Sequence, residues 1–252
     1  MSDSDIKSLG ERLVSYCTEY NIPLEHVFEI LTDQKVTPMI RGKAMEFNAY
    51  LLLTKILSKA SWSVQKLNLN AQTGTYDEDI SVTHKRTGII LKVESKSAVR
   101  GSVSDGKHAQ KIKEPHFKVK CHRSRSNIKL AGSTNDRYSI DSFDILITNP
   151  SNAIFEGKTV GEHLEIVHDP DIRQMLLEHY KAKNDLELIN VCSNDWRFCI
   201  PKDIAEKGFI PRTPYVKLNS DENWKNLEQL ELRLLKVVEE KWKSNSQAKR
   251  RN

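Results

Sequence analysis

The chain lacks the signals of membrane, secreted and disulfide-stabilised proteins. Its 252 residues contain no run of 18 apolar residues that could span a bilayer. The first five residues are mostly polar and acidic, without the apolar stretch of a secretion signal. Only 4 cysteines occur, and no two of them form a C-x-x-C pair. We therefore expect a cytoplasmic protein with reduced thiols, no zinc site and no membrane contact.

Several enzyme motifs are also missing. The chain has no phosphate-binding G-x-x-x-x-G-K-S/T loop and no G-x-S-x-G elbow, which argues against nucleotide-driven motors and the commonest serine hydrolases. His116 and Lys118 begin an H-x-K motif of the phospholipase-D type, but Arg123 stands where that motif needs an aspartate.

The composition is that of a globular protein, with 38% hydrophobic and 29% charged residues. We expect an α/β fold in which helices flank a central mixed sheet, as one domain without a clear boundary. Its parts would be a helical N-terminal part (1–60), a core (61–150), a C-terminal part (151–242) and a disordered basic tail (243–252). Helices are expected at about 4–20, 23–33, 39–59, 171–181 and 221–242. Besides the hairpin described next, strands are expected at about 62–68, 116–122, 142–148, 186–191 and 196–200. A short element is expected at 162–167.

The most informative segment is a β-hairpin that begins at Asp79. Its two arms alternate with period two and flank a polar turn that contains Gly88. If Lys85 faces Gly88, then Asp79 lies opposite Glu94, and Lys96 shares the same face. The other face is apolar and suits a core; it carries Ile80, Val82, Leu91 and Val93.

Two adjacent carboxylates repel each other unless a cation lies between them. Mg²⁺ suits this arrangement because it binds one or two carboxylates together with water and a substrate phosphate. Lys96 could then orient the attacking water and offset charge on the phosphate. The pattern therefore predicts in-line hydrolysis of a phosphodiester; a solvated hairpin with a cross-strand ion pair is the alternative.

Asp79 followed by Glu94-Ser95-Lys96 resembles the active site of the PD-(D/E)XK nuclease superfamily. The proline that precedes the aspartate in that family is replaced by Glu78, and Asp77 is a rival for the metal-binding aspartate. The resemblance implies that Asp79 and Glu94 bind metal, with the Ser95 carbonyl as a candidate ligand.

Glu46 lies at the edge of an apolar stripe in the helix expected before the hairpin. The resemblance implies that this carboxylate assists a second metal ion. The alternative is an ordinary glutamate at the rim of a helix.

A basic segment directly follows the hairpin. Residues 95–137 contain 11 lysines and arginines against 3 acidic residues, a formal +8, in a chain that carries +5 overall. Such a local field is typical of a surface that binds a polyanion, although a solvated lysine-rich loop would look the same. Within it, Phe117, Val119 and Cys121 alternate with basic residues. The candidate DNA-binding residues are Lys118, Lys120, Arg123, Arg125, Asn135 and Arg137.

This arrangement, over about residues 41–150, resembles type II restriction endonucleases. The resemblance implies a Mg²⁺-dependent endonuclease that cuts double-stranded DNA at a specific sequence, acts as a homodimer and has a companion DNA methyltransferase. A repair or junction-resolving nuclease of the same fold and a non-catalytic DNA-binding protein are the alternatives.

Overall fold

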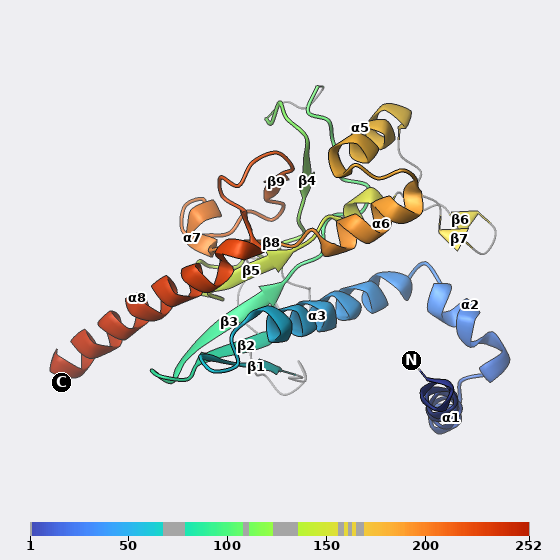
Figure 1. Ribbon diagram of the computed structural model, residues 1–252, viewed down its shortest axis with the longest axis horizontal. Helices are drawn as coiled ribbons and strands as arrows, with labels where there is room; N and C mark the ends of the chain where they lie inside the picture. Colours follow the sequence, from blue (N-terminus) through green and yellow to red (C-terminus); the bar gives the residue numbers. More distant parts are fainter. Residues whose placement is uncertain are drawn as a thin grey trace. The chain divides into compact units, whose positions relative to one another are not determined.

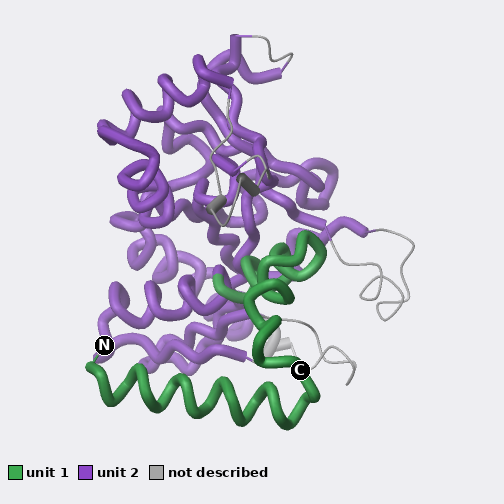
Figure 2. Tube along the Cα trace, turned by 90° about the vertical axis from the view of Figure 1, so that its right-hand side faces the viewer, with its two compact units in different colours: residues 1–44 green, residues 45–252 purple. Residues whose placement is uncertain are grey.

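The computed structural model describes residues 2–67, 79–107, 111–122, 136–155, 159–160, 163–164 and 169–251. The chain divides into two compact units, residues 1–44 (unit 1) and 45–252 (unit 2), at a point where the sequence shows no clear boundary (Figure 2). Within the described ranges, no helix is both long and apolar enough to cross a membrane.

Unit 1 is helical. It contains α1 (Asp3–Glu19), the 3-10 turn η1 (Leu24–His26), α2 (Val27–Thr32) and the start of α3 (Thr37–Ile56). A capping box between Ser2 and Asp5 fixes the first turn of α1, because each side chain satisfies a backbone N–H of the other residue. The predicted helices at 4–20 and 39–59 are confirmed, whereas the helix predicted at 23–33 is divided into η1 and α2.

Unit 2 is built on a mixed sheet of six strands, ordered β1-β2-β3-β5-β8-β10 (Figure 1). The strands are β1 (Trp62–Lys66), β2 (Ile80–His84), β3 (Ile89–Ser95), β5 (Ile145–Thr148), β8 (Arg197–Cys199) and β10 (Lys225–Asn226). Only the β3–β5 pair is parallel; the other neighbours in this sheet are antiparallel. The predicted α/β class with a mixed sheet flanked by helices is confirmed.

Each face of the sheet has its own apolar core. Residues of α3 and α8 (Leu230–Arg251) pack on the face that carries Ile145 and Ile147. Residues of α5 (Pro170–Tyr180) and α6 (Asp185–Asn194) pack in the core that contains Leu146, whose side chain points to the opposite face. A small antiparallel sheet joins this second core; its strands are β4 (His116–Lys118) and β9 (Tyr215–Lys217). The remaining short elements are η3 (Ser151–Ile154), β6 (Thr159–Val160), β7 (His163–Leu164), α7 (Pro201–Ile204) and η4 (Leu227–Gln229).

The register of the β2–β3 hairpin follows the sequence pattern. Ile80 pairs with Val93, and Val82 pairs with Leu91, which is the register obtained when Lys85 faces Gly88. Gly88 has a φ of +68°, a left-handed conformation that glycine adopts without steric cost. The hairpin prediction is therefore confirmed, including the burial of its apolar face.

Other predictions differ from the structure. The segment 116–122 supplies β4 to the small sheet rather than to the central sheet. The segment 186–191 is part of helix α6 rather than a strand. The last helix begins at Leu230 instead of 221, and it continues to Arg251 through most of the tail that was expected to be disordered. The predicted element at 162–167 lies largely outside the described residues.

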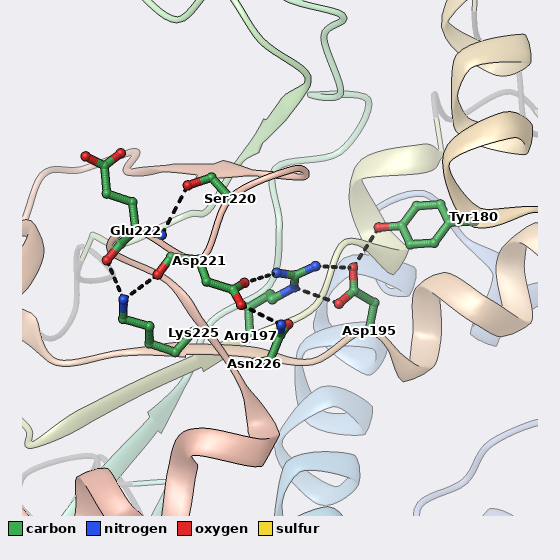
Figure 3. A network of polar contacts seen from close by, with 8 residues as sticks. All are labelled: Tyr180, Asp195, Arg197, Ser220, Asp221, Glu222, Lys225 and Asn226. Carbon is green, nitrogen blue, oxygen red and sulfur yellow. Dashed lines mark hydrogen bonds and ion pairs between the residues drawn. The ribbon is translucent and has the colours of Figure 1, made fainter.

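A network of hydrogen bonds and ion pairs connects β8 to the neighbouring elements (Figure 3). The Arg197 guanidinium donates to Asp195 at 2.7 Å and to Asp221 at 2.8 Å. The Tyr180 hydroxyl donates to Asp195 at 2.8 Å, and the Asn226 amide donates to Asp221 at 2.7 Å. The network thus links α5, the end of α6, β8 and β10 around one largely buried cation. Elsewhere, all 4 cysteines are free and buried.

Candidate active site

The two carboxylates of the hairpin lie at one end of the central sheet. Asp79 immediately precedes β2, and Glu94 is the penultimate residue of β3. The backbone N–H of Ser95 donates to Asp79 Oδ2 at 2.9 Å, which holds this carboxylate against the end of β3. Only 7% of Asp79 and 5% of Glu94 is exposed. The structure therefore brings together two buried carboxylates that the sequence pattern placed on one face.

Lys96 completes the cluster. Its ammonium forms an ion pair with Glu94 Oε1, and it lies 5.0 Å from the centre of the Tyr138 ring. The parallel strand β5 fixes the backbone here, because Lys96 N donates to Ile147 O at 3.0 Å and the Thr148 hydroxyl donates to Lys96 O at 2.6 Å. The position of Lys96 thus depends on a strand that is distant in sequence.

Glu46 reaches the same end of the sheet from α3. Its Oε2 atom lies 2.8 Å from the ammonium of Lys66, the last residue of β1. That ammonium also donates to the backbone carbonyl of Asp79 at 3.3 Å. Lys66 was not predicted as a site residue, although its side chain points to the same side of β1 as those of Trp62 and Val64. A lysine at a core-facing position was the signal that could have revealed it.

The electrostatics of the cluster centre on Asp79. Burial raises the pKa of the Asp79 carboxyl, and the neighbouring Glu94 and Glu46 carboxylates raise this pKa further, to about 7. The Lys96 ammonium and the hydrogen bond from Ser95 oppose the increase. Burial is the largest single effect and lowers the pKa of Lys96, but the combined effects of Glu94, Tyr138 and Asp79 outweigh it, so that the pKa is raised overall and Lys96 stays charged. When Asp79 is ionised, the carboxylates of Asp79, Glu94 and Glu46 outnumber the ammonium groups of Lys66 and Lys96 by one.

The donor set suits a hard divalent cation. No group of three or more His, Cys, Asp or Glu side chains among the described residues is arranged to hold a metal ion. Mg²⁺, however, needs only one or two protein carboxylates when water and a substrate phosphate supply its other oxygen ligands. Asp79 and Glu94 provide these two carboxylates. Burial and the neighbouring Glu94 and Glu46 carboxylates raise the pKa of Asp79 because they disfavour its ionised form, and a bound cation would offset the charge of that form.

The structure describes only some of the candidate DNA-binding residues. Lys118 lies in β4, with its ammonium 5.8 Å from the centre of the Tyr215 ring, and Lys120 and Arg137 are exposed. Phe117, Val119 and Cys121 are fully buried, so the apolar face of this segment is confirmed. His116, which the alternation places on the basic face, is buried instead. Arg123, Arg125, Asn135 and Asp77 lie outside the described residues.

Arg137 also lines a cavity of about 380 Å³ beside the β4–β9 sheet. Three further cations line this cavity: Lys111, Arg212 and Lys217. Arg212 and Lys217 come from the last quarter of the chain, far from the basic segment that the sequence analysis singled out. Folding thus brings these two cations beside Arg137, where Arg212 pairs with Asp136 and Lys217 pairs with Glu114 and Glu222.

Comparisons with protein-family models, with curated proteins and with solved structures found no match. Inference about function therefore rests on the geometry and chemistry of this chain's own residues.

Proposed function

We propose that this chain is a Mg²⁺-dependent endonuclease that hydrolyses phosphodiester bonds of double-stranded DNA. The observation that carries the proposal is the contact between Asp79 and Ser95 at the end of the hairpin, with Glu94 and Lys96 beside it. Two buried carboxylates and one ammonium in this order are the groups that metal-assisted phosphodiester hydrolysis requires.

Each residue has a definite role in the proposed reaction. Asp79 and Glu94 would hold Mg²⁺, with the Ser95 carbonyl as a further candidate ligand. Bound Mg²⁺ supplies Lewis-acid polarisation of the phosphate and lowers the pKa of water. Lys96 orients the attacking water and offsets the charge that develops on the phosphate oxygens. Lys118, Lys120 and Arg137 contribute positive charge for the DNA backbone.

The arrangement of the elements supports the resemblance to PD-(D/E)XK nucleases. A helix that carries Glu46 precedes the hairpin, and the strand with Glu94 lies inside a mixed sheet between β2 and β5. From the same resemblance we propose a restriction-endonuclease-like core, cleavage at a specific sequence of the type II restriction kind, a homodimer that cuts both strands and a companion DNA methyltransferase.

Digestion of long DNA of known sequence tests the proposal directly. We expect discrete fragments with Mg²⁺ and intact DNA with Ca²⁺ or EDTA, and sequencing of the fragment ends should reveal one short shared motif. Cutting only at branched junctions would favour a junction-resolving nuclease. Intact DNA in every metal, with DNA binding retained, would refute the catalytic assignment.

Glu94→Ala separates catalysis from binding. This variant should lose cleavage yet keep or tighten DNA binding, because it removes repulsion between a carboxylate and the phosphates. Glu239→Gln, which changes an exposed glutamate of α8, is the matched control and should cut at the wild-type rate. If both variants cut DNA equally well, Glu94 has no role in catalysis.

A further inference from the structure

The contact between Lys66 and Glu46 has no role in the reaction outlined above. Its two side chains are largely buried, with 8% of the Lys66 side chain and 14% of the Glu46 side chain exposed. An ion pair this far from water stays together, because separating it leaves a poorly hydrated charge without compensation.

The ammonium of Lys66 occupies a site with several contacts. It lies 2.8 Å from Glu46 Oε2, 3.3 Å from the Asp79 carbonyl oxygen and 5.5 Å from the centre of the Phe47 ring. A carboxylate, a carbonyl and an aromatic ring all attract a cation. These contacts come from two elements, α3 and the approach to β2, and converge on the end of β1.

Glu46 and Asp79 are also the carboxylates between which a second divalent ion would have to lie. The Lys66 ammonium contacts both residues, at Glu46 Oε2 and at the Asp79 carbonyl oxygen. In sites with two metal ions, the ions lie roughly 3.5–4 Å apart and share carboxylates. The Lys66 ammonium already contacts Glu46 and the backbone of Asp79. A divalent ion placed between Glu46 and Asp79 would therefore be repelled by this ammonium at close range.

We propose that the Lys66 ammonium takes the place of a second metal ion, so that the site holds a single divalent ion between Asp79 and Glu94. Glu46 then serves to position Lys66 and is not a metal ligand, contrary to its role implied by the resemblance. The three carboxylates of the cluster then face two fixed ammonium groups, Lys66 and Lys96, and one exchangeable divalent cation. This inference rests on the proposed function.

Counting bound metal tests the inference independently of cleavage. The full chain is titrated with Mn²⁺, and the electron paramagnetic resonance signal of free Mn²⁺ reports how many ions each chain removes. The wild type should bind one ion, and Glu46→Gln should also bind one. Lys66→Met should gain a second ion, because Glu46 and Asp79 then lose their fixed cation. Lys85→Met, a lysine in the turn at the far end of β2, is the matched control and should still bind one.

Two different outcomes would overturn the inference. If the wild type binds two ions and Glu46→Gln binds one, Glu46 is a metal ligand and Lys66 replaces nothing, while the nuclease proposal stands. If the wild type binds no Mn²⁺ at all, the proposed function fails together with the inference. Should Lys66→Met fail to fold, as tryptophan fluorescence would show, the comparison of the wild type with Glu46→Gln still decides between one ion and two.

Discussion

Replacing Asp79 by asparagine should stabilise the metal-free protein at alkaline pH. The Asp79 carboxyl is buried beside Glu94 and Glu46, and its pKa is raised from 3.8 to about 7. Asparagine is neutral at every pH, and its amide oxygen can still accept the hydrogen bond that Ser95 N donates to Asp79. The variant therefore removes an unfavourable charge and keeps the local geometry.

The sign and size of the effect follow from proton linkage. At pH values between 3.8, the ordinary pKa of the Asp79 carboxyl, and about 7, the folded protein holds a proton on Asp79 that the unfolded chain has released. This proton stabilises the fold fully at low pH, and the stabilisation is lost as the pH rises through about 7. For these two pKa values, the loss between pH 5 and pH 8 is roughly 3 kcal/mol. The stability advantage of Asp79→Asn over the wild type should grow by this amount.

Urea unfolding in EDTA at pH 5 and pH 8, followed by tryptophan fluorescence, measures this difference. All 4 tryptophans lie in unit 2, so the signal reports the unit that contains the site. Taking the difference between variant and wild type cancels the other titrating groups, and Glu239→Gln serves as a control that should show no pH-dependent difference. A difference for Asp79→Asn that is equal at both pH values, or a less stable variant at pH 8, would refute the argument.

Three further predictions concern the charged residues around the site. Lys96→Ala should lower the cleavage rate by at least about 100-fold and leave Mn²⁺ binding intact; retained cleavage would exclude Lys96 from the reaction. Arg137→Ala should weaken DNA binding and reduce the salt dependence of log Kd by about 1, and an unchanged salt slope would show that Arg137 contacts no phosphate. Arg197→Ala should lower the free energy of unfolding by roughly 3 kcal/mol because it leaves the Asp195 carboxylate without its counter-charge. Arg233→Ala, at an exposed pair with Asp203, should cost less than about 1 kcal/mol; equal losses would contradict the role of the buried network.

The hairpin could be predicted because its determinants are local. Alternating apolar residues, a glycine in the turn and a fixed side-chain period of two leave one register that buries the apolar face. The same reasoning placed Asp79 beside Glu94, and in the structure the Asp79 carboxylate accepts a hydrogen bond from the backbone N–H of Ser95, the residue after Glu94. The metal-binding and catalytic roles of these residues stay predictions.

Helix α6 shows where period-two reasoning fails. Residues 186–191 alternate like a strand, but the Asn184 side chain accepts a hydrogen bond from Glu187 N and caps a helix. Two acidic residues in the first turn favour the same helix. Leu188 and Cys192, one helical turn apart, are buried, whereas Leu186 is 77% exposed. The N-terminal signals were present in the sequence and outweigh the alternation.

Other features could not be predicted because they depend on contacts between distant segments. The pairing of β4 with β9 joins residues about 100 positions apart and leaves no trace in the local pattern of either segment. The same holds for Arg212, which reaches the cavity beside Arg137 only in the folded chain. The partner of Glu46 was missed for this reason too, since Lys66 lies on a separate strand.

The parallel pairing of β3 with β5 has a consequence for the order in which the protein folds. β2 and β3 are adjacent in sequence and can pair early, whereas β5 follows only after residues 96–144, so the second neighbour of β3 closes a long loop. A nascent chain that ends before β5 can therefore form the hairpin with Asp79 and Glu94 still open to water. We expect the anchoring of Lys96 by Ile147 and Thr148, and with it the mature carboxylate cluster, to arise in a late step of folding.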